Sequence, residues 1–320
     1  MTTCPPPYRP LRGADPPHFV DRADEEDMGT SAILASSIAA YRAGPCDPRF
    51  HRLVVSHSAM GKTALLRAVG REAAARLDWA VVMHRCRPKE RALGAAVGQT
   101  LAHMQKQWPM QAGRLAREVS PCCNREPPLF SLTNGVSPVD GGSLAVDVPG
   151  PLEREVSRAT LRQFLQRAGQ FARSISRGLL IMFDDADSLG GGEVESLGHL
   201  ARSLSRDGLP VAMLFSGGPE LRERFARLDN FLGCIWPTSL GWFDGSESRE
   251  ALVVPAADRD VEFQEQALEL ICSAADGSPL EIQRLGFAAW AAAAGSDVVK
   301  VDDVRAALRQ LAPELPARAS

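Results

Sequence analysis

Ser56-His57-Ser58-Ala59-Met60-Gly61-Lys62-Thr63 is the stretch that decides the fold of this chain. It follows a short apolar run at 53–55 and opens a segment with helical periodicity at 64–69. A strand, a tight loop and a helix in that order form a cradle for phosphate, because the loop and the first helical turn aim unpaired backbone N–H groups at the anion. We therefore predict a phosphate-binding loop at 56–63.

The residue types in this loop suit a nucleoside triphosphate. Gly61 lets the backbone approach, Lys62 would place its ammonium between the outer phosphates, and the Thr63 hydroxyl would ligate the Mg²⁺ that bridges them. The usual pattern begins with glycine, but Ser56 stands there; a positive φ at Ser56 would cost about 1 kcal/mol and weaken the loop. The expected nucleotide-binding residues are Ser56, His57, Ser58, Ala59, Met60, Gly61, Lys62, Thr63 and Ala64.

A second motif lies further along the chain, where an apolar run at 178–183 ends in Asp184 and Asp185. Such a run predicts a strand buried on both faces of a parallel sheet, and ligands bind at the carboxyl ends of such strands. We expect Asp184 to hold Mg²⁺ opposite Thr63, and Asp185 to orient or deprotonate an attacking water. The alternative is a solvated cap at the end of the strand, which the presence of the phosphate loop disfavours.

The composition is that of an ordinary globular protein. The chain has 320 residues, of which 45% are hydrophobic and 23% charged, enough for one large or two modest domains. A net charge of −3 leaves no general footprint for nucleic acid, and the densest basic run, 84–89, is interpreted as a solvated loop after a strand. Seven cysteines without a C-x-x-C pair, and no signal peptide, predict a cytoplasmic protein with no metal site beyond Mg²⁺ and no membrane span.

The pattern along the chain predicts an α/β core followed by helices. Residues 1–25 are rich in proline and charge, so we expect a disordered tail that buries little, and residues 26–242 form the core. The segment 108–150 is an irregular insertion in this core, with an Asn134-Gly135 turn. Strands are expected at 51–56, 79–83, 178–183, 210–216 and 231–238, with helices at 26–43, 90–107, 151–176 and 193–206 and after Pro219.

Beyond residue 243 the strand signals vanish. Helical periodicity predicts an all-helical subdomain at 243–320, with helices at 246–257, 261–275, 279–294 and 302–311.

With these motifs the chain resembles the AAA+ ATPases, and among them bacterial proteins similar to the ATPase part of origin-recognition-type initiators. The resemblance covers about 27–312 and rests on 56–63 as Walker A, 179–185 as Walker B, Ser216 at the end of the sensor-1 strand and a lid-like run at 263–290. It implies a parallel five-stranded P-loop sheet flanked by helices, a helical lid, ATP with Mg²⁺, a γ-phosphate sensor at Ser216, and an arginine finger from a partner subunit.

The sequence departs from the family pattern at both nucleotide motifs. Walker A lacks its first glycine and has Ala59 where another is common. Walker B carries Asp185 in place of glutamate, a side chain one methylene shorter. Both changes spare the charged groups of the site, so the resemblance still implies nucleotide binding.

The expected arginines are also displaced. The segment 231–234, where similar proteins often carry arginine, has none, and Arg224 and Arg227 on the preceding helix are poor substitutes. In the lid, the turn at 277–279 is followed by Leu280 and Glu281, where many relatives place a sensor-2 arginine, and Arg284 is the nearest cation. An arginine finger is worth about 10³ to 10⁵ in turnover, so we expect binding to survive better than hydrolysis.

Three functional hypotheses follow. The first is a slow Mg²⁺-dependent ATPase that acts as a switch, with Lys62, Asp185 and Ser216 as catalytic residues. The second is a nucleotide-binding scaffold or regulator that works through a homo- or hetero-oligomeric protein partner. The third is a P-loop kinase, although the apolar helix around 288–294 does not suit its arginine-rich lid. No winged-helix module follows the lid, so a DNA-loading role is not expected.

Overall fold

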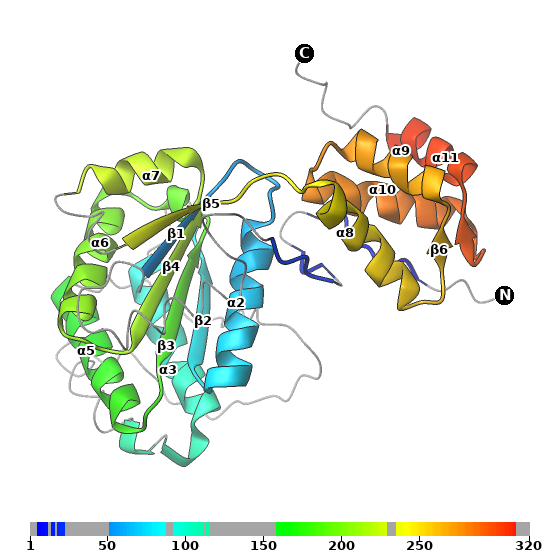
Figure 1. Cartoon of the computed structure of the whole chain (residues 1–320). Helices are drawn as coiled ribbons and strands as arrows, with labels where there is room; N and C mark the ends of the chain where they lie inside the picture. The colour runs from blue at the N-terminus through cyan, green and yellow to red at the C-terminus, as the bar shows by residue number, and fades with distance from the viewer. Residues whose placement is uncertain are drawn as a thin grey trace. The chain divides into compact units, whose positions relative to one another are not determined.

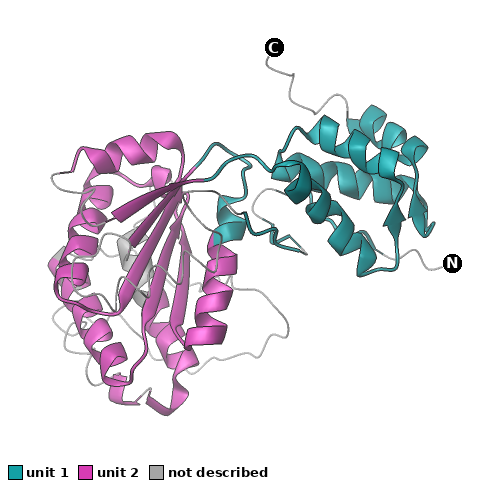
Figure 2. Ribbon diagram, in the orientation of Figure 1, with its two compact units in different colours: residues 1–30, 56–65, 240–320 teal, residues 31–55, 66–239 magenta. Residues whose placement is uncertain are grey.

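The computed structural model describes residues 5–11, 14–16, 18–22, 51–87, 92–111, 113–115, 158–228 and 235–311 (Figure 1). The chain divides into two compact units, one containing residues 1–30, 56–65 and 240–320 and the other containing residues 31–55 and 66–239 (Figure 2). The predicted helix at 26–43 and the Asn134-Gly135 turn lie outside the described residues. Within the described ranges, no helix combines the length and apolar character that crossing a membrane requires.

A parallel sheet forms the centre of the larger unit. In the part of the chain that the structure describes, it has five strands in the order β2-β3-β4-β1-β5, which confirms the predicted sheet. The central strands β3 and β4 are buried along their whole length, as a parallel sheet covered on both faces requires. The strands are β1 (His51–Val55), β2 (Ala80–Arg85), β3 (Leu179–Asp184), β4 (Val211–Gly217) and β5 (Ile235–Ser239).

Helices cover both faces of this sheet. The alternation of side chains along each strand sends Phe183 and Phe215 to one face, where their rings stack 5.4 Å apart, and Met182 to the other, close to Gly70 of α2. The helices of this unit are α2 (Lys62–Leu77), whose first turn groups with the smaller unit, α3 (Ala92–Gln107), α5 (Arg158–Ser174), α6 (Gly191–Arg206) and α7 (Pro219–Ala226), with short 3₁₀ turns η2 (Pro109–Gln111) and η3 (Ala186–Ser188).

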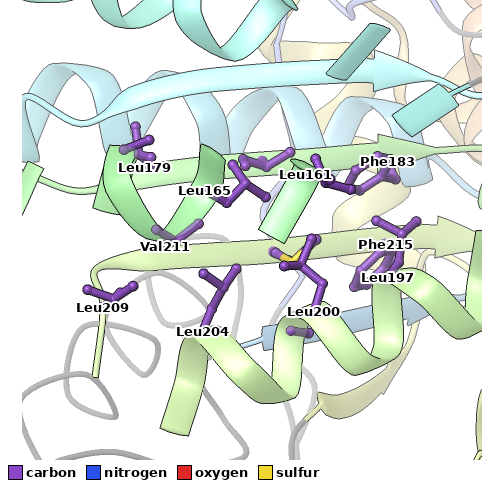
Figure 3. Close-up of a cluster of buried hydrophobic side chains, with 14 of the residues drawn as sticks. Leu161, Leu165, Leu179, Phe183, Leu197, Leu200, Leu204, Leu209, Val211 and Phe215 are labelled. Atoms are coloured by element: carbon purple, nitrogen blue, oxygen red, sulfur yellow. The ribbon is translucent and has the colours of Figure 1, made fainter. Parts of the chain in front are cut away.

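Leucines from α5 and α6 fill the core on the Phe183 face. Figure 3 shows them directed at β3 and β4, and all are at most 5% exposed. Burying each such side chain contributes about 1.5–3 kcal/mol, so this layer fixes the strands whose ends carry the acidic motif. The leucines are Leu161, Leu165, Leu197, Leu200 and Leu204.

The start of the predicted irregular insertion belongs to the same core. Of the segment 108–150, the structure describes 108–111 and 113–115, and both Trp108 and Leu115 are buried. The Trp108 indole N–H donates to the Asp78 carbonyl at 3.1 Å, which ties this segment to the end of α2.

The smaller unit is mainly helical, as the sequence indicates. Its helices are α8 (Gly245–Ala257), α9 (Glu265–Ala275), α10 (Pro279–Ala292) and α11 (Val301–Leu311). Asp244 caps α8 by accepting the Glu247 N–H at 2.7 Å, and Ser278 caps α10 with Pro279 in the first turn. The expectation that strands are absent beyond 243 is wrong: β6 (Glu262–Phe263) pairs in parallel with β7 (Val298–Val299), and two-residue strands are too short to show an alternating pattern.

The expectation that the N-terminal segment buries little is also wrong. Tyr8 and Val20 are 2% and 4% exposed and belong to the core of the helical unit. The Tyr8 ring packs edge-on against Phe263 and Trp290, and its hydroxyl donates to the Leu252 carbonyl at 2.7 Å. Burial raises the pKa of this phenol. A few apolar residues among prolines are enough to anchor the segment, because the helices supply the rest of the core.

Candidate functional site

The phosphate loop follows directly from the buried strand β1. β1 ends at Val55, which pairs with Gly217 of β4, so the chain enters the loop at the carboxyl edge of the sheet. Gly61 has a φ of +90° and precedes α2, whose first turn closes with a hydrogen bond from the Leu65 N–H to the Gly61 carbonyl at 2.9 Å. Only glycine adopts such a φ without strain, which explains the residue type at this position.

Backbone strain in the loop falls on Ala59 and not on Ser56. Ser56 is not among the residues with positive φ, whereas Ala59 has a φ of 69°. A non-glycine residue in this conformation costs about 1–2 kcal/mol. Ser56 therefore does not incur the cost that a positive φ would bring, and the alanine in place of the second glycine carries the strain.

The Lys62 ammonium lies within its own loop. It donates to the carbonyl oxygens of Ser56 at 2.9 Å and His57 at 2.8 Å, and contacts the Ser56 hydroxyl at 3.4 Å. These contacts hold the positive charge beside a loop in which His57 and Ser58 are exposed. A phosphate group carries more negative charge than a carbonyl oxygen, so the ammonium is placed to exchange these partners for an anion.

Three of the predicted residues meet at the ends of β3 and β4. Asp184 is completely buried, and its Oδ1 accepts a hydrogen bond from the Ser216 hydroxyl at 2.6 Å. The Ser216 Oγ in turn accepts the backbone N–H of Asp185 at 3.3 Å. Ser216 therefore connects the two acidic residues, one through its side chain and the other through its backbone.

The Asp185 carboxylate has a partner that the sequence analysis did not identify. Its Oδ2 accepts a hydrogen bond from Arg85 Nε at 3.1 Å, and Asp185 itself has a left-handed backbone with φ of 54°. Arg85 is the last residue of β2, beside Asp184 in the register. Because β2 lies on the side of β3 away from β4 and β1, this contact turns the Asp185 carboxylate toward the β2 side.

The basic run at 84–89 was therefore misinterpreted in part. His84 and Arg85 belong to β2, and His84 is buried with its Nδ1 3.3 Å from Gln99 Oε1. The Cys86 N–H that follows the strand also donates to the Asp184 carbonyl, at 2.8 Å. A local pattern gave no sign that Arg85 pairs with a residue one hundred positions further on.

Arg224, one of the two arginines near the expected finger position, and Arg284, the cation nearest the expected sensor-2 position, have structural partners. Arg224 donates to the carbonyls of Asp187 at 2.8 Å and Leu189 at 2.5 Å, which fastens α7 to the turn after β3. Arg284 contacts Glu281 at 3.2 Å, one turn away on α10. Both side chains therefore contribute to local structure in the described residues.

Comparison with known proteins agrees with this geometry. A family model described as an AAA ATPase domain matches residues 39–214, more than half of the chain. The chain belongs to the AAA ATPase domain family. Membership places it among nucleotide-binding ATPases, and the described five-stranded sheet and helical C-terminal unit confirm the predicted AAA+ fold.

Solved structures show the same fold at low sequence identity. This AAA ATPase resembles Cdc6p from Pyrobaculum aerophilum, with a TM-score of 0.53, 13% identity and coverage of 92% of this chain and 69% of that one. It also resembles Aeropyrum pernix ORC2 in ADPNP and ADP complexes, with a TM-score of 0.56, 16% identity and the same coverage. A third similar structure, Aeropyrum pernix ORC1 in complex with DNA, has a TM-score of 0.51 and 15% identity, with coverage of 92% of this chain and 66% of that one. No curated protein sequence matches the chain.

The donor groups of this AAA ATPase fit the nucleotide and the cation that the family implies. Asp184 offers a carboxylate and Thr63 a hydroxyl, and hard oxygen donors of this kind suit Mg²⁺. Lys62 supplies one positive charge, and the loop that carries it opens a helix N-terminus, where anions bind favourably.

Proposed function

We propose that this protein is a Mg·ATP-binding molecular switch that hydrolyses ATP slowly. The observation that carries the proposal is the Lys62 ammonium, which the carbonyls of Ser56 and His57 hold within the predicted phosphate loop. Family membership supports nucleotide binding in general. ATP is the proposed nucleotide because a relative of the same fold, the ORC2 protein of Aeropyrum pernix, is described in complexes with ADPNP and ADP.

Each residue of the proposed site has one role. Lys62 neutralises the outer phosphates, and Thr63 and Asp184 provide oxygen ligands for Mg²⁺. When bound, the cation draws negative charge away from the terminal phosphoryl group. Ser216, which donates to Asp184, senses the γ-phosphate through this hydrogen bond. Asp185 orients the attacking water.

The contact between Asp185 and Arg85 adds to the slowing expected from the missing arginine finger. The carboxylate faces β2 while this pair is intact, and it must leave Arg85 before it can act on a water molecule. The two side chains are 37% and 60% exposed, and exposed pairs contribute less than about 1 kcal/mol. The contact therefore lowers the population of the active arrangement without abolishing it, and a partner that supplies an arginine would restore faster hydrolysis.

The same contact favours one alternative function. A protein in which Asp185 stays with Arg85 would bind ATP without hydrolysing it and would act as a scaffold or regulator for a partner protein. We propose a protein partner rather than DNA, because the net charge of −3 supplies no general attraction to phosphate backbones. The DNA complex of Aeropyrum pernix ORC1 describes a property of ORC1, and we do not transfer it to this chain.

Calorimetric titration of Mg·ATP tests nucleotide binding. We expect a micromolar Kd for the wild-type protein and no detectable heat for Lys62→Ala, because the ammonium is the principal charge in the loop. Lys106→Ala is the matched control, since this lysine is exposed on α3 and its loss removes the same charge. Equal affinity in the wild type and Lys62→Ala would falsify the proposed site.

Phosphate release separates the switch from the scaffold. For the switch, we expect slow release of phosphate from the wild-type protein and none from Asp185→Asn, with unchanged Kd for Mg·ATP. Binding without phosphate release in the wild type, under conditions where Lys62→Ala does not bind, would establish the scaffold instead.

A further inference from the structure

Arg22 contacts two segments that are far from it in the sequence. Its Nη2 donates to the Met60 carbonyl of the phosphate loop at 2.6 Å, and its Nη1 donates to the Gly241 carbonyl at 2.7 Å. The guanidinium carbon lies 4.6 Å from the centre of the Phe243 ring, within range of a cation–π interaction. All four residues belong to the smaller unit.

The hydrogen bond to Met60 has a consequence for the loop N–H groups. The Met60 carbonyl and the Gly61 N–H belong to one planar trans peptide, so they point in opposite directions. Gly61 has a φ of +90° and no Cβ, so no side chain at this position opposes rotation of the peptide. Arg22 holds the carbonyl on one side and thereby fixes the direction of the Gly61 N–H on the other.

The charge of Arg22 also strengthens that N–H group. A cationic donor draws electron density toward the carbonyl oxygen that accepts its hydrogen bond and so polarises the peptide, and hydrogen bonds in such a chain reinforce one another. An N–H group that is both fixed and polarised binds an anion better than one that rotates freely.

The other contacts of Arg22 lead to the start of α10. The Phe243 N–H donates to the Gly277 carbonyl at 2.8 Å. Gly277 has a φ of +72°, and a Cβ at this position would lie 2.6 Å from the Phe243 carbonyl oxygen, so the two segments are packed closely. Gly277 directly precedes Ser278, the N-cap of α10. Contacts therefore run without a break from the phosphate loop to the first turn of a helix.

Arg22 is itself held by an anchored segment. Tyr8 donates to the Leu252 carbonyl of α8, and His18 Nε2 lies 2.7 Å from Glu250 Oε1 on the same helix. These contacts tie the segment before Arg22 to α8, which limits the freedom that the arginine loses when it binds the loop.

We propose that Arg22 is a positioning residue that fixes the Met60–Gly61 peptide for phosphate binding and couples the phosphate loop to the start of α10. The role for phosphate rests on the proposed ATP-binding function, but the coupling exists without nucleotide. The proposal can therefore be tested in both states of the protein.

Amide hydrogen exchange without nucleotide tests the coupling. The reporters are the Leu65 N–H, bonded to Gly61, and the Phe243 N–H, bonded to Gly277. We expect both to exchange about tenfold faster in Arg22→Ala, because losing a hydrogen bond to a charged group has an effect of this size. Arg9→Ala is the matched control, since this arginine is exposed on the same segment. In this variant the two reporter N–H groups should exchange at the wild-type rates. Unchanged exchange at Leu65 and Phe243 in Arg22→Ala would overturn the proposal.

Titration of Mg·ATP tests the positioning role. We expect Arg22→Ala to bind about tenfold more weakly than the wild type. Arg22→Lys should recover part of this loss because an ammonium can still donate to the Met60 carbonyl but lacks the planar fork. If the alanine variant does not fold, the lysine variant decides the proposal, with smaller changes of the same sign in both measurements.

The two measurements separate this proposal from the proposed function. If the wild-type protein does not bind Mg·ATP, the proposed nucleotide site is wrong. The exchange rates in Arg22→Ala then still test the coupling. Wild-type binding that Arg22→Ala retains at full strength overturns the positioning role and leaves the nucleotide site intact.

Discussion

His51 makes the stability of the larger unit depend on pH. The ring is completely buried, with its Nε2–H donating to the Ala201 carbonyl at 2.9 Å and its Nδ1 accepting the Met213 N–H at 3.1 Å. Both ring nitrogens are used by the neutral form, and burial lowers the pKa of His51 from 6.5 to about 4. A second ring proton would break the bond from Met213 and place a charge in the core.

The size of the effect follows from proton linkage. Between pH 6.5 and 4 the unfolded chain binds a proton at His51 that the folded protein does not, so stability falls as the pH falls. The full difference corresponds to about 3 kcal/mol, at 1.36 kcal/mol for each tenfold change in proton affinity. About 2 kcal/mol of this should be lost between pH 7.5 and pH 5.

Urea unfolding followed by circular dichroism measures this loss. The comparison is with His51→Gln, whose amide does not titrate, so that the pH dependence of all other groups cancels. We expect the wild-type free energy of unfolding to fall by about 2 kcal/mol more than that of His51→Gln over this range. The same pH dependence in both proteins would show that His51 does not stay neutral in the fold.

Three further substitutions test other contacts. Arg85→Ala should raise ATP turnover by up to about fivefold. The reason is that an exposed pair stabilises the bound orientation of Asp185 by less than about 1 kcal/mol of free energy. A fall in phosphate release would refute this. Gly277→Ala should lower unfolding stability by about 2 kcal/mol or more, because a backbone oxygen lies 2.6 Å from the new Cβ, whereas Gly245→Ala has open space and should cost little. Tyr8→Phe removes a buried hydrogen bond and should cost about 1 kcal/mol in thermal unfolding.

The sequence predicted the elements that local pattern determines. Apolar runs located the strands of the sheet because a strand buried on both faces needs consecutive apolar residues, and β3 and β4 meet that condition. Boundaries were less accurate: the second strand was expected at 79–83 and lies at Ala80–Arg85. Polar residues at its end, His84 and Arg85, broke the apolar pattern while remaining in the ladder.

Contacts between distant residues were not accessible from the sequence. The partners Arg85 and Asp185, Arg22 and Met60, and Tyr8 and Leu252 are joined by the fold, and no local pattern links them. The candidate site was therefore predicted as a set of residue types. The orientation of its Asp185 carboxylate, on which the proposed hydrolysis depends, came only from the structure.

The anchored N-terminal segment matters for how the protein is handled. Residues 1–25 are rich in proline and charge, so they would ordinarily be removed when a shorter version is made for crystallisation or expression. Such a version would lack the Tyr8 ring between Phe263 and Trp290 and would expose an apolar hollow on the helical unit to water. It would lose Arg22 as well, so under the role proposed for Arg22 a nucleotide affinity measured on that protein would be lower than that of the whole chain.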